Sequence, residues 1–94
     1  MDAKVYYWTN SKYLNVGTGV AIPTPSEIEA NYRLFWSDVV NDDTTPDNLF
    51  ARFNMSDEYI ELPEGVNHTS LSVGDIIVLD RRFNICLPLG WREI

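Results

Sequence analysis

The sequence predicts a small α+β domain: a mainly antiparallel β-sheet of four or five strands with one or two short helices packed on it. The 94 residues make a single domain, residues 1–94, near the lower end of the size range that folds alone. Hydrophobic residues make up 45% and aromatic residues 13%, which supplies one core and excludes a disordered chain. Short β-branched and aromatic runs, separated by turns that contain Pro and Gly, predict the strands.

The first third of the chain predicts one or two strands and a short helix. The run KVYYWT over residues 4–9 is aromatic and β-branched, as is typical of a strand. A shorter strand is expected over residues 20–22, before two closely spaced prolines. The sequence TPSE then supplies a capping hydroxyl, a proline in the first turn and an acid, so we expect a helix over residues 24–31.

Residues 32–40, YRLFWSDVV, predict a further strand. A period of two places three apolar side chains on the same face, which is the pattern of a strand with one buried side. These side chains are Tyr32, Leu34 and Trp36. One continuous helix over residues 26–40 is the competing interpretation.

A second helix is expected after an acidic loop. Thr45, Pro46 and Asp47 repeat the helix-start pattern, and the apolar residues that follow have helical spacing, so the helix covers residues 46–54. Its buried residues are expected to be Leu49, Phe50 and Phe53. A long irregular connection follows over residues 55–69.

The end of the chain predicts a β-hairpin and a last short strand. IIVL at residues 76–79 has the continuous apolar character of a buried strand. Residues 80–82 form the hairpin turn, residues 83–87 return antiparallel, and residues 91–94 close the sheet. Over the whole chain, the residues expected to be mostly buried are Leu34, Trp36, Leu49, Phe53, Leu71, Val73, Ile76 and Val78.

Acidic residues are concentrated in the middle of the chain. The net charge is −7, and residues 38–64 hold eight acids and one base, which accounts for all of it. Such a segment repels phosphate backbones and attracts basic protein surfaces. We interpret six of these acids as candidate partner-binding residues, and improved solubility alone is the alternative. The six are Asp42, Asp43, Asp47, Asp57, Glu58 and Glu61.

Residues that could support catalysis or hold a metal are few. The only histidine, His68, and the only cysteine, Cys86, are too few for a zinc site, and nothing in their spacing predicts a dyad. The acids of residues 42–47 lack the central Gly and the terminal Glu of a calcium loop. We therefore expect no enzyme, no metal and no cofactor. A small enzyme with a deep polar pocket at His68 remains as a third class of function.

A secondary candidate patch lies late in the chain, where Arg81, Arg82 and Trp91 combine basic and aromatic side chains. Patches of this kind hold single-stranded nucleic acid by stacking. Because the chain is acidic as a whole, we expect a protein partner and no direct contact with nucleic acid. Self-association into a homodimer stays open.

The sequence also predicts where the protein works. No apolar run approaches the length of a membrane span, and the first residues, MDAKVYYW, do not form a signal peptide. The single cysteine cannot form an internal disulfide, which suits a reducing compartment. We expect a protein of the host-cell cytoplasm with no membrane partner.

The composition of the run SLSVGD at residues 70–75 predicts a structural turn. The hydroxyl of Ser70 or Ser72 can bond to the backbone, Gly74 permits a positive φ, and Asp75 can accept backbone N–H groups. A turn that binds a ligand is the alternative.

Three stretches resemble the YodL-like domain family of bacteria, phages and conjugative elements. They are LFARFN at residues 49–54, TSLSVGDIIVLD at residues 69–80, and Gly90–Trp91 near the end. The resemblance covers about residues 32–94. Members of that family recur beside antirestriction and mobile-element functions, so the resemblance implies a protein encoded by a phage or a mobile element.

Together, the charge and the resemblance predict a non-enzymatic protein-binding module. It would dock on a host protein that handles nucleic acid or takes part in defence, and inhibit it. The alternative is a housekeeping interaction or scaffold domain with no inhibitory role.

Overall fold

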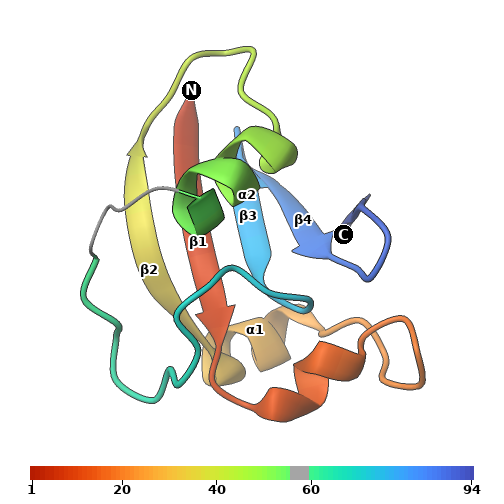
Figure 1. Ribbon diagram of the computed structural model, residues 1–94. Helices are drawn as coiled ribbons and strands as arrows, with labels where there is room; N and C mark the ends of the chain where they lie inside the picture. Colours follow the sequence, from red (N-terminus) through yellow and green to blue (C-terminus); the bar gives the residue numbers. More distant parts are fainter. Residues whose placement is uncertain (56–59) are drawn as a thin grey trace.

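The computed structural model describes residues 1–55 and 60–94, and it has a five-stranded antiparallel sheet with two α-helices (Figure 1). The strand order is β2-β1-β3-β4-β5, so the N-terminal strand lies between its two sequence-distant neighbours. This confirms the predicted α+β fold. The elements are β1 Asp2–Trp8, the 3₁₀ helix η1 Ser11–Asn15, α1 Pro25–Asn31, β2 Tyr32–Val39, α2 Pro46–Met55, β3 Ile76–Leu79, β4 Arg82–Cys86 and β5 Trp91–Glu93.

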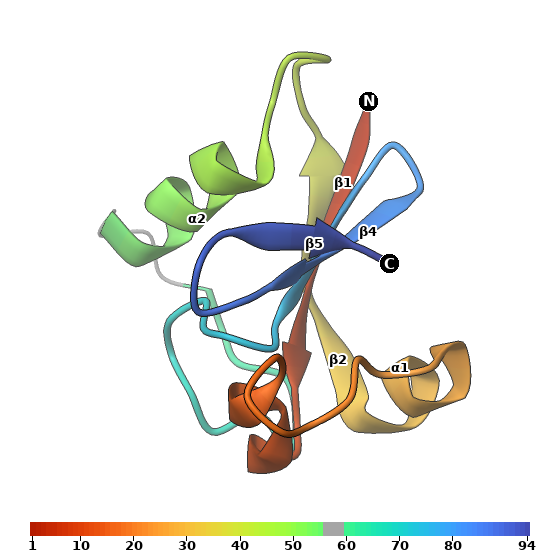
Figure 2. The ribbon, with the colours of Figure 1, turned by 90° about the vertical axis from the view of Figure 1, so that its right-hand side faces the viewer.

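The two α-helices lie on opposite faces of the sheet (Figure 2). Leu49 and Phe53 of α2 pack on the face formed by Ala3, Val5 and Tyr7 of β1. The other face is covered at one end by η1 and α1, through a second cluster of side chains. The buried members of that cluster are Trp8, Tyr13, Val16, Tyr32, Ile76, Val78 and Ile85. Among the described residues, no helix has the length and apolar character needed to cross a bilayer.

Helix α1 forms where its sequence predicts it. Thr24 accepts a hydrogen bond from the backbone N–H of Glu27, the Glu27 side chain bonds back to Thr24, and Pro25 occupies the first turn. The helix ends at Asn31, because the next residue, Tyr32, is extended and begins β2. The alternative of one helix over residues 26–40 is therefore wrong.

A β-bulge changes which side chains of β2 face the core. Val5 pairs with Trp36, but the next residue of β1, Tyr6, pairs with Leu34, so Phe35 is an extra residue on β2. Phe35 and Trp36 consequently both pack on the α2 side, while Leu34 lies on the other face and is 47% exposed. The prediction that Leu34 is buried on the same face as Trp36 was wrong, because a strict period of two does not continue through a bulge.

Two further predictions are corrected. No strand forms over residues 20–22; Val20 makes only an isolated bridge with Val16. Phe50 is exposed rather than buried, and its ring meets Trp91 edge-on at the surface. Of the eight residues expected in the core, Leu49, Leu71, Ile76 and Val78 are buried, whereas Trp36, Phe53 and Val73 are half-buried.

The hairpin between β3 and β4 is a two-residue turn. Asp80 and Arg81 have φ values of 49° and 65°, and Leu79 pairs with Arg82 across the turn. Two successive positive φ values are the geometry that matches the twist of a tight hairpin. Arg82, expected in the turn, is instead the first residue of β4.

Candidate functional site

The turn that leads into β3 is built around the carboxylate of Asp75. This side chain is fully buried, at 0% exposure. Its two oxygens accept hydrogen bonds from the backbone N–H of Ser72 at 2.8 Å and from that of Trp8 at 3.0 Å. One residue therefore closes its own turn and also joins that turn to the end of β1, as expected for an acid that accepts backbone N–H groups.

Aromatic residues from distant parts of the chain hold the carbonyl groups of the same turn. Trp8 donates its indole N–H to the Val73 carbonyl at 3.0 Å, and the Tyr32 hydroxyl donates to the Gly74 carbonyl at 2.6 Å. Gly74 has a φ of +92°, as predicted, and a Cβ at this position would overlap the backbone carbonyl of Tyr13. The run therefore needs glycine for two reasons: its backbone conformation and the close approach of η1.

His68 completes the set of groups around Asp75. Its Nε2 lies 2.9 Å from both carboxylate oxygens, and its ring stacks on Trp8 at 3.9 Å and on Tyr7 at 4.6 Å between centroids. Burial raises the pKa of Asp75, and the contact with His68 and the two backbone N–H groups opposes that rise. The pair is thus a buried, hydrogen-bonded unit at the junction of β1 and β3.

Two polar atoms beside this unit have no hydrogen-bond partner among residues 1–55 and 60–94. They are the Tyr7 hydroxyl and Nδ1 of His68, and both are buried. Nε2 faces Asp75 and Nδ1 is buried, so the ring is held by Asp75 and by the stacking of Trp8 and Tyr7. The arrangement orients His68 and ties its segment to the end of β1.

Cys86 shares backbone contacts with the same turn, but its thiol is poorly suited to be a nucleophile. The Cys86 N–H donates to the Asp75 carbonyl at 2.9 Å, and its carbonyl accepts from Gly74 N–H at 2.8 Å. Burial, followed by the charges of Asp75 and Asp47, raises the pKa of the thiol to about 11. No group of three or more potential metal ligands occurs in the described part of the chain.

Thiol labelling tests this state of Cys86. A thiol pKa of about 11 instead of an ordinary value near 9 leaves about a hundredfold less thiolate at pH 8, and burial limits access further. We therefore expect the folded protein to react with a disulfide reagent at least about a hundredfold more slowly than the urea-unfolded protein. Equal rates in the two states would show that the thiol is accessible and ionisable in the fold.

The acids predicted to bind a partner fall into separate groups. Asp42 and Asp43 are exposed in the loop before α2, and Asp47 is exposed in its first turn. Glu61 is exposed but follows the other end of this ten-residue helix, which is about 15 Å long. Asp57 and Glu58 lie outside the described residues.

Two of these acids have partners within the protein. Asp42 contacts the N-terminal ammonium group at 3.0 Å, although its own side chain is 93% exposed. Asp47 accepts a hydrogen bond from the indole N–H of Trp91 at 2.9 Å. Both contacts use one carboxylate oxygen at the surface, so negative charge still faces solvent at the N-terminal end of α2.

The basic and aromatic residues of the secondary patch do not lie together. Arg81 and Arg82 are exposed at the β3–β4 turn. Trp91 pairs with Cys86 at the other end of β4, about 13 Å along the strand from Arg82. Its ring packs toward α2 and Asp47. The structure therefore separates Trp91 from the two arginines.

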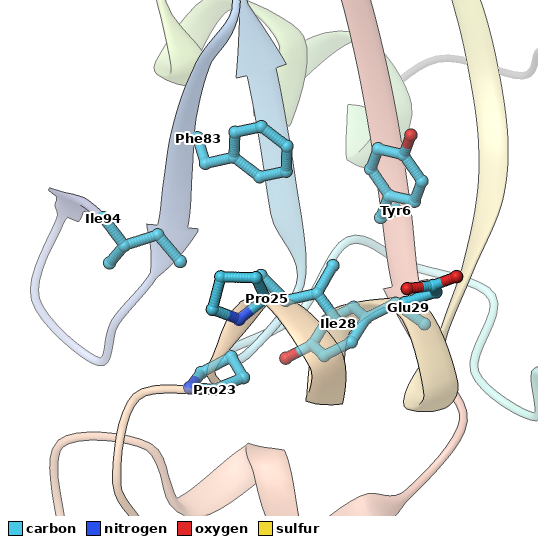
Figure 3. Close-up of a pocket in the computed structure, with 8 residues that line it drawn as sticks. Tyr6, Pro23, Pro25, Ile28, Glu29, Phe83 and Ile94 are labelled. Atoms are coloured by element: carbon cyan, nitrogen blue, oxygen red, sulfur yellow. The ribbon is translucent and has the colours of Figure 1, made fainter.

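A pocket that the sequence did not reveal opens on the face of the sheet opposite α2. It has a volume of about 540 Å³ and is bounded by strands β1 and β4, by α1 and by the residues that precede α1. Figure 3 shows Tyr6 and Phe83 on two sides of an open space, with Pro25 and Ile28 of α1 along a third. The complete lining is Tyr6, Pro23, Pro25, Ile28, Glu29, Tyr32, Phe83 and Ile94.

In a comparison with protein families, the chain matches the YodL-like domain over residues 9–93. The chain belongs to the YodL-like domain family. The match starts well before the region of resemblance at residues 32–94, so it also includes η1 and α1. Comparisons with curated proteins and with solved structures give no match.

The sequence features that suggested the YodL-like domain are in contact with one another. Asn54, near the end of α2, donates its side-chain amide to the Leu71 carbonyl at 2.9 Å and accepts from Leu71 N–H at 2.7 Å. The Phe-Asn pair of the helix and the Ser-Leu-Ser-Val run are thus joined by two hydrogen bonds. Phe53 packs edge-on against Phe35 and Trp36 of the bulge. In this YodL-like domain, the recognisable residues hold α2 and β3 in place.

Sequence reasoning missed the partners of these residues for a simple reason. Trp8 and Tyr32 reach the turn from segments far away in the chain, and no local pattern records those contacts. His68 is close in sequence, but its contact with Asp75 depends on how the chain folds back between them. The pocket of the YodL-like domain also arises from residues in four separate segments. The available sequence signal was the position of Tyr6 and Phe83, two large aromatic residues in predicted strands. In the structure both side chains are half-exposed.

Proposed function

We propose that this YodL-like domain is a non-enzymatic protein-binding module that docks an acidic surface on a basic protein. The observation that carries the proposal is the charge distribution. Residues 38–64 account for the whole net charge of −7. Of these, Asp42, Asp43 and Asp47 are exposed together at the N-terminal end of α2. A compact set of acids of this kind attracts and orients a basic partner.

The internal use of the reactive side chains supports a binding role over an enzymatic one. His68 and Asp75 are hydrogen-bonded to each other inside the fold, and the pKa of Cys86 is raised. The pocket on the sheet face opposite α2 is lined mainly by apolar side chains, with Glu29 as its one charged residue, and His68 is not among the residues that line it. A pocket of this composition binds molecules better than it transforms them.

The partner we infer is a host protein that handles nucleic acid or takes part in defence, in the host-cell cytoplasm. Such proteins carry basic surfaces because they contact phosphate backbones. An acidic module encoded by a phage or mobile element would occupy that surface and inhibit the host protein. The second candidate is a housekeeping scaffold domain, for which the acidity only maintains solubility.

Affinity capture from a bacterial lysate tests this proposal. The bait is the wild-type protein, compared with a variant in which Asp42, Asp43 and Asp47 are all changed to Asn. Asparagine keeps the oxygen that accepts from Trp91, so only charge is removed. We expect the wild type to retain a basic protein that the variant loses, while the two proteins melt within a few degrees of each other.

The matched control removes three charges elsewhere, through the substitutions Asp38→Asn, Glu64→Gln and Glu93→Gln. All three are exposed. This control has the same net charge as the test variant and is expected to retain the partner. Equal recovery of every captured protein by all three baits would contradict docking through the N-terminal end of α2 and would favour the scaffold alternative.

A further inference from the structure

The pocket on the sheet face opposite α2 has aromatic walls suited to a side chain. Tyr6 pairs with Ile76 and Phe83 pairs with Val78, so the two aromatic residues stand on either side of β3, whose own residues do not line the pocket. The strands that carry Tyr6 and Phe83 are two positions apart, which separates their backbones by about 10 Å. A volume of about 540 Å³ lies within the range of sites that hold small organic groups.

The pocket is open because α1 is short. Its seven residues cover one end of this face, and the pocket lies beside it, between Ile28 and the two aromatic rings (Figure 3). The exposed side chain of Leu34 lies on the same face, beside Tyr6. An apolar surface of this kind, with rings on both sides, favours a large flat apolar group.

One charge borders the pocket, and it is negative. Glu29 is the only charged residue of the lining, it is exposed, and no ion pair involves it within the described residues. The other acid of α1, Glu27, is already bonded to Tyr13 and lies 3.8 Å from Lys12. Lys4 and Arg92 lie on the same face of the sheet by register but outside the lining.

We propose that this pocket binds an aromatic side chain presented by a basic peptide segment of a partner protein, with Glu29 pairing with an arginine or lysine beside that side chain. The rings of Tyr6, Tyr32 and Phe83 supply contact area for the aromatic group. The carboxylate at the edge selects for positive charge, and the net charge of −7 adds long-range attraction. The site does not depend on the acidic end of α2, which lies across the sheet.

The test uses three blocked pentapeptides, Gly-Arg-Trp-Arg-Gly, Gly-Glu-Trp-Glu-Gly and Gly-Arg-Ala-Arg-Gly, titrated into isotopically labelled full-length protein and followed by NMR. We expect the Arg-Trp-Arg peptide to shift the backbone signals of Tyr6, Ile28, Phe83 and Ile94. The Arg-Ala-Arg peptide should leave those signals in place, because it lacks the aromatic group. The Glu-Trp-Glu peptide should bind several-fold more weakly than the Arg-Trp-Arg peptide.

Two variants with the same change in net charge separate the pocket from general attraction. Glu29→Gln should lower the affinity for the Arg-Trp-Arg peptide by about two- to fivefold, the effect expected from losing an exposed ion pair. Asp43→Asn, at the loop before α2, should change the affinity by less than that. Phe83→Ala should abolish the shifts at Tyr6 and Ile28 while Ile77 and Leu79, on the other face, keep their folded chemical shifts.

Four results would overturn the proposal. They are equal affinity for the Arg and Glu peptides, an equal effect of Glu29→Gln and Asp43→Asn, shifts confined to α2 and its loop, and the absence of binding by all three peptides. Pocket signals that change with protein concentration alone would show that a second copy of the chain fills the site instead. Docking of a partner protein through Asp42, Asp43 and Asp47 is decided by the capture experiment and not by these peptide titrations.

Discussion

Replacing Asp75 by alanine is expected to lower the free energy of unfolding by about 3–5 kcal/mol, because three hydrogen-bond partners lose their acceptor at about 1–3 kcal/mol for each buried group. The carboxylate is fully buried and accepts from Trp8 N–H, Ser72 N–H and His68. Its removal leaves two backbone donors and an imidazole without their acceptor, the Trp8 N–H in a buried position and the other two in partly buried ones. A loss of this size is a large share of the stability of a domain of 94 residues.

Urea unfolding measures this loss, with Asp43→Ala as the matched control. Asp43 is exposed, so its replacement should change stability by no more than about 0.5 kcal/mol. The stability of Asp75→Asn should fall between those of Asp75→Ala and Asp43→Ala, because asparagine keeps the size of the side chain and one acceptor oxygen but not the charge. If Asp75→Ala and Asp43→Ala had the same urea midpoint, Asp75 would not organise the turn.

Replacing Gly74 by alanine is expected to cost about 2–6 kcal/mol, from about 1–3 kcal/mol of backbone strain and about 1–3 kcal/mol of overpacking. The φ of +92° is unfavourable for any residue with a Cβ, and that Cβ would overlap the Tyr13 carbonyl. The overlap is with backbone, which cannot rotate away as a side chain does. Gly74→Val should be more destabilising still.

Gly90→Ala is the control that separates strain from overlap. Gly90 has a φ of +81°, and nothing lies within 4 Å of the position of its Cβ. It should therefore show the strain alone, about 1–3 kcal/mol. Thermal or urea unfolding of both variants gives the comparison. If Gly74→Ala and Gly90→Ala lowered the free energy of unfolding equally, η1 would not be in close contact with this turn.

Local sequence patterns predicted the parts of the fold that depend on neighbouring residues. The capping hydroxyl of α1, the apolar run of β3 and the positive φ of Gly74 all follow from a few adjacent residues. The bulge at Phe35 could not be predicted in this way, since it depends on how β2 pairs with β1. One extra residue moved Leu34 and Trp36 to opposite faces of the sheet.

The candidate sites were harder to predict than the fold. The acid of the SLSVGD run was expected to accept backbone N–H groups, but its partners at Trp8 and His68 come from two other segments. The pocket likewise requires that β4, α1 and β1 be placed side by side. The arginines at residues 81 and 82 are close to Trp91 in sequence, yet the length of β4 separates them in space.

Association kinetics with the captured protein test the central claim, docking of an acidic surface on a basic partner, most directly. The on-rate is measured at ionic strengths of about 0.01 M and about 0.1 M, between which the Debye length falls from about 30 Å to about 10 Å. For the wild type we predict a decrease of about tenfold or more. The variant with Asp42, Asp43 and Asp47 changed to Asn should start from a lower on-rate and lose much of this dependence, with a smaller change in off-rate. An on-rate that is indifferent both to salt and to these three substitutions would contradict the claim.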